Sequence, residues 1–230
     1  MGGGKFERHV PYFVVLEAFQ ASGGCALCDL ELDSMRHYFE SVLYESVNDP
    51  KLRADLRKSH GYCHRHAHQL RSFNDALAVA ILCRDQISQF LSSPEEPHGW
   101  SLGALFHHHP APSDTPVRCP ACVAQAATRA RHVDVLLDSL HSDPEMRTTF
   151  KASPGLCVPH FHAVLAAPNL AVDVRRQVVN VIAGKFTALL AELEELCAKY
   201  DYQRLAEKPG GEADSWIRAV EMTVGRKDVF

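Results

Sequence analysis

The chain has 230 residues and a formal net charge of −4, with 46% hydrophobic and 23% charged residues. This is the composition of a soluble globular protein of one or two domains, and it shows neither the basic patch typical of nucleic-acid binding nor an apolar run of about 18 residues for a membrane span. The N-terminus lacks the basic and then apolar pattern of a signal peptide, so we expect a cytoplasmic protein whose thiols stay reduced.

The spacing of apolar residues predicts helices along almost the whole first half of the chain. Asp49 suits the N-cap of a short helix and Pro50 its first turn. Gly61 lies in the break that follows this helix. The helices predicted in this half cover residues 10–19, 28 to about 48, 50–58 and 63 to about 91.

The second half repeats this plan. Helices are predicted over about 120–141, 144–152, from 157 onward, over 169–200 and over 213–224. Apolar residues between 179 and 200 recur at spacings of three and four, which is a heptad pattern. Such a pattern indicates packing within the protein's own bundle or, as an alternative, a homodimer seam. Cys83 and Cys197 lie in apolar helical stretches, where we expect small buried side chains.

Residues 94–118 between the two halves form a Pro/His-rich linker. A connection of this length without regular structure is often functional or mobile. His107, His108 and His109 lie within it. We expect these histidines to be solvated, with metal binding as the alternative.

Four potential metal ligands occur twice at the same spacing, 94 positions apart. Each set reads C-x2-C, then 34 residues, then C-x2-H. Three cysteines and one histidine are a recurring ligand set for tetrahedral zinc, so the pattern predicts two zinc ions per chain. The first set is Cys25, Cys28, Cys63 and His66, and the second is Cys119, Cys122, Cys157 and His160.

Other residues match in the same register, and together they predict an internal duplication. They include Asp49-Pro50 with Asp143-Pro144, Ser59 with Ser153, Gly61 with Gly155, and His68 with His162. We therefore expect an all-α helical bundle built from two tandem repeats related by a pseudo-two-fold axis, each with one Cys3His metal site. The predicted division is a first repeat over 1–93, the linker over 94–118, a second repeat over 119–205, and a tail with a short helix over 206–230.

The ligand motifs are expected at helix starts, where the helix dipole stabilises thiolates. Three thiolates and Zn²⁺ leave a net negative charge, and Arg53, Arg65 and Arg147 are candidate neighbours. His68 and His162 follow the ligand histidines by two residues and therefore point away from the ion. We expect them to be core histidines or to hydrogen-bond near the site, with ligation or a separate reactive site as the alternative.

Motifs along nearly the full length also carry a resemblance. They are HVPYF at 9–13, CALC at 25–28, NDP at 48–50, GYC at 61–63, CPAC at 119–122, GLCVPH at 155–160, DY at 201–202 and DSW at 214–216. With these motifs the chain resembles an uncharacterised prokaryotic family of helical proteins built from two CxxC…CxxH repeats. The resemblance implies no established activity.

A complete set of four protein ligands leaves no open coordination position, which is typical of structural zinc. We therefore expect a non-catalytic scaffold or partner-binding protein that contacts neither nucleic acid nor membrane and that can form a homodimer through 179–200. The alternative is an iron–sulfur or thiol-based redox protein or enzyme that uses the duplicated sites. Whether the chain is an enzyme stays open; the candidate reactive groups are His68, His162 and the polar residues Asp201, Tyr202, Arg204, Glu212 and Asp214.

Overall fold

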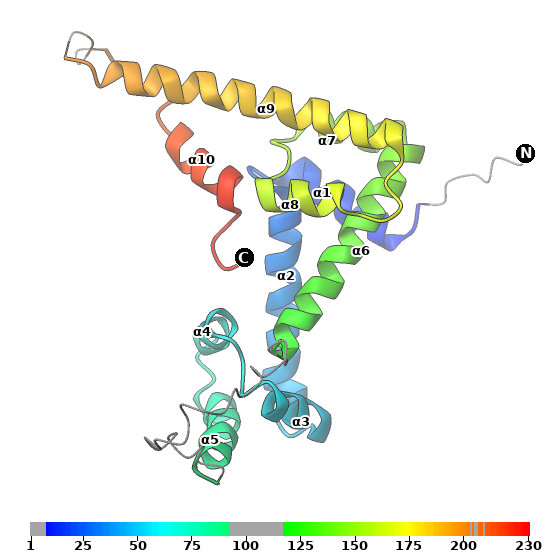
Figure 1. Ribbon diagram of the computed structural model, residues 1–230, viewed down its shortest axis with the longest axis vertical. Coiled ribbons are helices and arrows are strands. Elements are labelled where there is room, and N and C mark those ends of the chain that lie inside the picture. Colours follow the sequence, from blue (N-terminus) through cyan, green and yellow to red (C-terminus); the bar gives the residue numbers. More distant parts are fainter. Residues whose placement is uncertain (1–7, 93–116, 203, 205–206, 209) are drawn as a thin grey trace, which may run out of the picture. The chain divides into compact units, whose positions relative to one another are not determined.

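The computed structural model describes residues 8–92, 117–202, 204, 207–208 and 210–230. These residues form ten α-helices and one π-helical segment, and none of them lies in a strand (Figure 1). The expected all-α fold is therefore confirmed. Within this described part, no helix combines the length and apolar character that crossing a bilayer requires.

The helices of the second half lie close to their predicted positions, whereas the first half has one helix more than predicted. The first half contains α1 (Val10–Ala21), α2 (Ala26–Ser41), the π-helical segment η1 (Val42–Ser46), α3 (Pro50–Lys58), α4 (His64–Ser72) and α5 (Ala76–Ser92). The second half contains α6 (Pro120–Ser142), α7 (Pro144–Ala152), α8 (Val158–Leu165), α9 (Val172–Lys199) and α10 (Ser215–Val224).

The long helix predicted from 63 to about 91 is wrong, because the chain breaks between α4 and α5. Asn74 has a φ of 59°, which a right-handed helix does not allow. The carboxylate of Asp75 accepts a hydrogen bond from the backbone N–H of Ala78 at 2.9 Å, as a residue at a helix start does. The Asn-Asp pair therefore ends one helix and starts the next.

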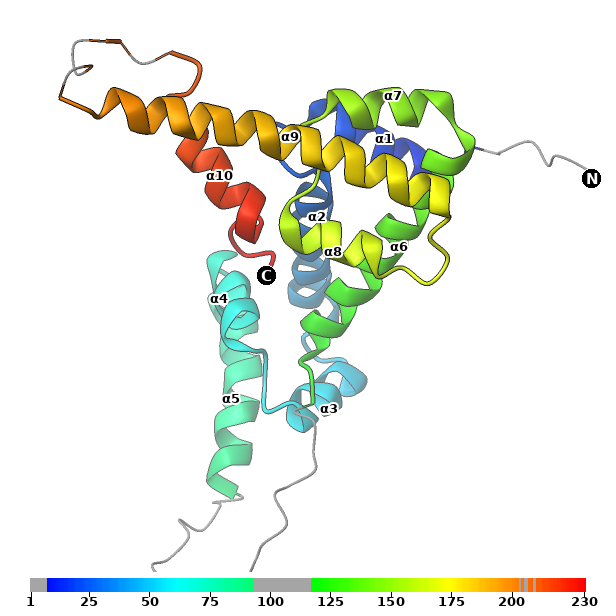
Figure 2. The ribbon, with the colours of Figure 1, turned by 45° about the horizontal axis from the view of Figure 1, so that its top comes forward.

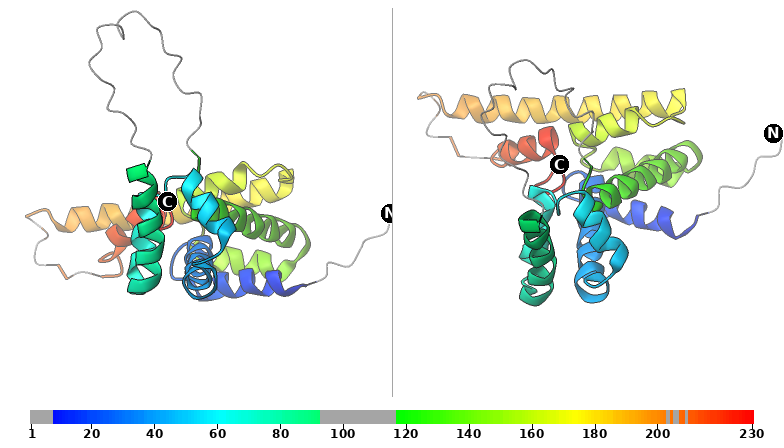
Figure 3. Two further views of the ribbon diagram at one scale, coloured as in Figure 1. Left: turned by 90° about the horizontal axis from the view of Figure 1, so that it is seen from below. Right: turned by 60° about the horizontal axis from the view of Figure 1, so that its bottom comes forward.

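The described chain divides into two compact units, whose boundaries lie within α2 and α6. Unit 1 comprises Met1–Ser34 and Ala127–Phe230, and unit 2 comprises Met35–Ala126, so the units differ from the predicted repeats. In unit 1, α1 lies along α7, and α10 packs against α8 and α9 (Figure 2). In unit 2, α5 packs against α3 and α4 (Figure 3).

Each unit has its own apolar core. In unit 1 the buried rings of Phe19 and Phe150 meet edge to face with their centroids 5.6 Å apart, a favourable arrangement for aromatic pairs. In unit 2, Phe39 is buried and contacts the rings of Tyr62 and Phe73. Cysteines of the predicted ligand sets belong to both cores, so the candidate sites lie inside the packed interior.

Equivalent positions of the two predicted repeats have equivalent local structure. The carboxylates of Asp49 and Asp143 cap α3 and α7, and each accepts the backbone N–H two residues further on at 2.8 Å. Gly61 and Gly155 have φ values of 97° and 100°, a region that favours glycine. The internal duplication and the pseudo-two-fold axis stay predictions.

Asp143 is buried, unlike the exposed Asp49, and links the start of α1 to α7. The guanidinium of Arg8 lies 2.8 Å from its carboxylate. Burial acts to raise the pKa of Asp143, but hydrogen bonds from Tyr12 and from the backbone of Glu145, together with the charge of Arg8, hold this pKa below its ordinary value. The carboxylate is therefore charged and stabilises the folded unit.

The heptad pattern of residues 179–200 lies on α9. Ile182 and Leu189 are buried and Phe186 packs against the core of unit 1, whereas Val179 and Tyr200 are exposed. The buried part of the pattern thus packs within unit 1. A homodimer seam stays a prediction.

The expectation that Cys83 and Cys197 are buried is wrong, because both are exposed. On α5 only Ala78 and Leu82 are fully buried. The side chain of Cys83 instead shares the opposite, outward face of α5 with the exposed Ile87. Apolar composition alone did not reveal which face of the helix is covered.

Candidate metal centres

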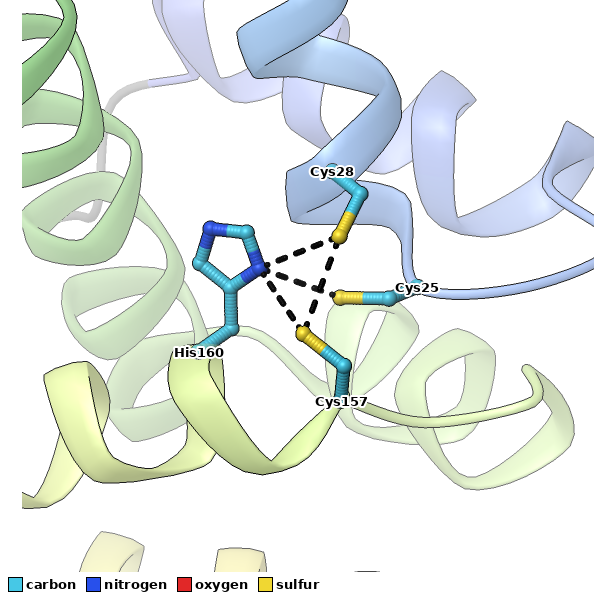
Figure 4. Close-up of side chains that lie close together, drawn as sticks. All are labelled: Cys25, Cys28, Cys157 and His160. Carbon is cyan, nitrogen blue, oxygen red and sulfur yellow. Dashed lines mark hydrogen bonds between the residues drawn. The ribbon is translucent and has the colours of Figure 1, made fainter. Parts of the chain in front are cut away.

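Four of the predicted ligands come together in unit 1. Figure 4 shows the side chains of Cys25, Cys28, Cys157 and His160 pointing toward one common point. The Nδ1 atom of His160 lies 3.4 Å from the Sγ atoms of Cys25 and Cys28 and 3.2 Å from that of Cys157, and the Sγ atoms of Cys28 and Cys157 are 3.6 Å apart. We call this group centre 1.

The other four ligands come together in unit 2, and we call this group centre 2. The Nδ1 atom of His66 lies 3.3 Å from the Sγ atom of Cys63 and 3.4 Å from those of Cys119 and Cys122. The Sγ atoms of Cys63 and Cys122 are 3.7 Å apart. In both centres all four donor atoms lie within 4.8 Å of one another, so each group could hold one metal ion.

The expected pairing of motifs within each repeat is wrong. Centre 1 combines the CxxC motif of the first repeat with the CxxH motif of the second, and centre 2 combines the remaining two motifs. Both pairings give three cysteines and one histidine, so the spacing along the chain could not distinguish them. The packing decides between them, because α8 meets the start of α2 in unit 1 and α4 meets the start of α6 in unit 2.

All four motifs have the same local structure. The first cysteine directly precedes a helix and the second ligand lies in the first turn of that helix; these helices are α2, α4, α6 and α8. Residues three positions apart share a helix face, so both side chains reach the same ion. The backbone N–H groups of a helix start stabilise thiolates, which are the metal-binding form of cysteine.

In centre 1 a buried carboxylate orients the histidine. The Nε2 atom of His160 lies 2.6 Å from Oε1 of Glu31, which is only 1% exposed. This contact places the ring hydrogen on Nε2 and leaves Nδ1 free to bind a metal. Arg129 neutralises Glu31 through two hydrogen bonds of 2.5 and 2.8 Å.

In centre 2 a neutral amide has the same role. Oε1 of Gln125 lies 3.2 Å from Nε2 of His66 and also accepts a hydrogen bond of 2.8 Å from Arg65. Burial and the charge of Arg65 lower the pKa of His66 to about 4. The ring is therefore neutral at pH 7, as metal binding requires.

The histidine and its partner are both charged in centre 1, whereas both are neutral in centre 2. Burial acts to raise the pKa of Glu31, but the hydrogen bonds from Arg129 and His160 hold it below the ordinary value. Burial acts to lower the pKa of His160, yet its hydrogen bonds with Cys157, Cys25 and Glu31 raise it to about 11. Metal binding at centre 1 must therefore displace a proton, as is general for cysteine and histidine ligands.

The end of the chain covers centre 1. The Phe230 ring lies 5.0 Å from the His160 ring, centroid to centroid, and the Arg129 guanidinium stacks over it at 4.5 Å. Gly225 makes this return possible, because it has a φ of 86° and a Cβ atom there would come within 2.5 Å of the Phe230 ring. The backbone N–H of Arg226 hydrogen-bonds to Cys28.

Several residues considered from the sequence lie outside both centres. His68 and His162 are exposed, so they are neither core histidines nor members of either group. Arg53 pairs with Asp85, and Arg147 donates to backbone carbonyls, whereas Arg65 does lie beside centre 2. His107, His108 and His109 fall outside the described residues.

Several polar residues of the tail make ion pairs. Arg204 pairs with Glu195 and Glu207, and Lys199 pairs with Glu212. Asp214 pairs with Arg218 within α10. None of these residues belongs to either group of potential ligands.

Sequence reasoning missed the partners of the two histidines, although a signal was present. Glu31 and Gln125 each follow the second cysteine of a CxxC motif by three residues and are themselves 94 positions apart. The start of one helix, over about two turns, therefore carries the two cysteines and the acceptor for the histidine. Arg129 and Phe230 gave no such signal, because their contacts with Glu31 and His160 arise only when segments far apart in the chain pack together.

Comparison with known proteins agrees with the resemblance found from the motifs. The uncharacterized 23.9 kDa protein in the xynA 3′ region of Caldicellulosiruptor sp. (strain Rt8B.4) is 28% identical over 204 residues, which cover 87% of this chain and 95% of that protein. No solved structure matches the chain. The family of unknown function DUF6062 matches residues 8–98 and 106–229, which is most of the chain, and the protein belongs to this family.

Proposed function

We propose that the protein binds two zinc ions, one in each centre, and that both ions are structural. The observation that carries this proposal is the pair of complete Cys3His donor sets with their short donor–donor distances. In each centre the ion would connect the starts of two helices that are far apart along the chain. The protein would then be a zinc-stabilised helical scaffold without catalytic chemistry at the metal.

The distances between donor atoms support a single tetrahedral ion. Zinc with Zn–S bonds of about 2.3 Å and a Zn–N bond of about 2.0 Å would separate its sulfurs by about 3.8 Å and sulfur from nitrogen by about 3.5 Å. One S–S distance in each centre, 3.6 and 3.7 Å, and the S–N distances of 3.2 to 3.4 Å are close to these values, and all donor atoms of a centre lie within 4.8 Å of one another. An iron–sulfur cluster binds its ligands through several irons and spaces them further apart, so zinc is favoured.

The ligand number supports a structural role. Catalytic zinc sites keep one position for water or substrate, whereas structural sites are filled by four protein ligands. Both centres offer four protein donors, and those of centre 1 are buried at 1% exposure or less. Hydrogen bonds from Nε2 of the two histidines to Glu31 and Gln125 add the supporting contacts that such sites use.

The energetic consequence is large. Structural zinc contributes roughly 10–16 kcal/mol of apparent binding free energy in small zinc domains, which is similar to the whole stability of a typical domain, about 5–15 kcal/mol. Without an ion, each centre leaves three cysteines and a histidine in contact with one another, next to an apolar core. We therefore expect each unit to lose its fixed structure when its ion is removed.

The metal content of anaerobically purified protein tests this proposal. Plasma mass spectrometry should find two zinc ions per chain, and the same sample should be colourless. Iron and sulfide in the sample, together with a visible absorption band, would instead support the iron–sulfur alternative. If a chelator removes both zinc ions while circular dichroism and the melting temperature stay unchanged, the structural role is refuted.

As a scaffold, the protein would act by binding a protein partner or a second copy of itself. The burial of Ile182 and Leu189 within unit 1 favours packing of the heptad pattern inside the chain. Light scattering after size-exclusion chromatography tests this part of the proposal. We expect a monomer at all concentrations. A dimer that the substitution Val179→Asp dissociates would instead show that the exposed edge of the heptad pattern mediates self-association.

A further inference from the structure

The two centres differ in the exposure of their cysteines. In centre 1, Cys25 is 1% exposed and Cys28 and Cys157 are 0% exposed. In centre 2, Cys119 is 4% exposed, whereas Cys63 and Cys122 are only partly buried. Two of the six ligand cysteines are therefore partly exposed to solvent, and both belong to the same centre.

The C-terminal segment explains why centre 1 is closed. Val229 is fully buried, and the ring of Phe230 lies against that of His160. In centre 2 the ring of Phe39, which belongs to the core of unit 2, packs against His66. Among the described residues, no segment buries Cys63 and Cys122 as the C-terminal residues help to bury centre 1.

The two partly exposed cysteines are also neighbours. The Sγ atoms of Cys63 and Cys122 are 3.7 Å apart, although these residues come from different motifs. A cysteine that binds a metal does so as the thiolate, which is also its nucleophilic form, so both sulfurs would be reactive in the zinc-bound centre. Accessible thiolates beside a second thiolate are the usual sites of reversible cysteine oxidation.

We propose that centre 2 is an oxidation-sensitive zinc site, in which a peroxide converts Cys63 and Cys122 to a disulfide and zinc is lost, while centre 1 keeps its ion. This inference rests on the proposed binding of zinc. It assigns different roles to two centres with the same ligand set. Centre 1 would hold unit 1 permanently, and centre 2 would make unit 2 responsive to oxidants.

The reaction uses one peroxide per disulfide. One thiolate attacks a peroxide oxygen, the O–O bond breaks, and a sulfenic acid forms while the departing hydroxide takes up a proton. The other thiolate attacks that sulfur, the S–O bond breaks, and a second hydroxide leaves and takes up a proton. Two thiolates, one hydrogen peroxide and two protons thus give one disulfide and two waters. The two sulfurs together lose two electrons, which the peroxide oxygens gain.

The disulfide removes two of the four ligands. The remaining pair, Cys119 and His66, cannot fill a tetrahedral site, so zinc is no longer held. The loss is confined to unit 2, because all four ligands of centre 1 belong to unit 1. Reduction of the disulfide with zinc present should restore the centre.

The test uses the full-length protein with Cys83→Ser and Cys197→Ser, which removes two exposed thiols that lie in neither centre. Zinc per chain is measured first, and a value other than two contradicts the proposed function rather than this inference. Hydrogen peroxide is then added anaerobically, and a chromogenic chelator follows the release of zinc. Tryptic digestion without reduction locates the disulfide.

The expected result is loss of one of the two zinc ions, with a disulfide that joins peptide 59–65 to peptide 119–129 through Cys63 and Cys122. Reductant and zinc should then restore two zinc ions per chain. Release of both ions at the same rate would overturn the inference. So would earlier loss from centre 1, or a disulfide between Cys119 and Cys122 that stays within peptide 119–129.

Discussion

Glu31 offers the sharpest test of how the protein supports a metal ligand. This buried carboxylate contacts Nε2 of His160 at 2.6 Å and pairs with Arg129. Replacing it with alanine leaves the imidazole N–H without its acceptor inside the core and removes the counter-charge of Arg129. We expect Glu31→Ala to weaken zinc binding at centre 1 and to destabilise unit 1, without a direct effect on centre 2.

The magnitude follows from these contacts. Loss of a group that orients a metal-bound histidine usually costs 10–100-fold in affinity, or about 1.4–2.7 kcal/mol. An unpaired buried N–H costs about 1–3 kcal/mol, and the partly exposed Arg129 adds about 1 kcal/mol. Added together, these contributions predict a loss of about 3–7 kcal/mol in the stability of the zinc-bound protein.

Glu31→Gln separates the hydrogen bond from the charge. A glutamine can accept from His160 just as Gln125 accepts from His66 at 3.2 Å, so zinc affinity should stay within about tenfold of the wild type. Competition with a chromogenic chelator measures both variants, and Gln125→Ala is the matched change at centre 2. The reasoning is refuted if Glu31→Ala binds two zinc ions with wild-type affinity, or if Glu31→Gln weakens binding as much as Glu31→Ala does.

Local contacts give further predictions that urea denaturation of the zinc-bound protein can measure. Asp143→Ala should cost about 2–3 kcal/mol, because it loses a helix cap and the ion pair between the buried carboxylate and the exposed Arg8, whereas Asp49→Ala should lose only an exposed cap worth about 1 kcal/mol; equal costs would contradict this. Since the pKa of Asp143 lies below its ordinary value, its contribution should be complete above about pH 4 and decrease as the pH falls further, and that decrease should be absent in Asp143→Ala. Gly155→Ala should destabilise more than Gly61→Ala, because both strain a positive φ by about 1 kcal/mol but only the first places a Cβ atom 3.0 Å from Ile182; the opposite order would show that the Ile182 contact relaxes freely.

The helices could be predicted where short-range patterns define them. Asp49 and Asp143, each followed by proline, mark two helix starts that the structure confirms through cap hydrogen bonds. The break at Asn74 was missed, because the apolar spacing continues through it and only the Asn-Asp pair marks it. The exposed Cys83 was missed for a related reason, since periodicity shows that a helix has an apolar face but not which part of that face another helix covers.

The candidate ligands could also be read from the sequence, whereas their pairing could not. Spacing identifies CxxC and CxxH motifs, but the choice between Cys63 and Cys157 as partner of the first CxxC motif depends on packing between helices far apart in the chain. The 94-residue register already matched Glu31 with Gln125. Their roles stayed hidden because the residue types differ and because the histidine that each one contacts comes from the other predicted repeat.

The central claim is that each centre combines one motif from each predicted repeat. The number of zinc ions bound by two double variants tests this claim most directly. Native mass spectrometry should find one zinc ion per chain in Cys28→Ala with Cys157→Ala, because both residues belong to centre 1. It should find neither ion firmly bound in Cys28→Ala with Cys63→Ala, because that pair damages both centres. The reverse result, with both ions lost in the first variant and one kept in the second, would show that each repeat binds its own ion and would contradict the account.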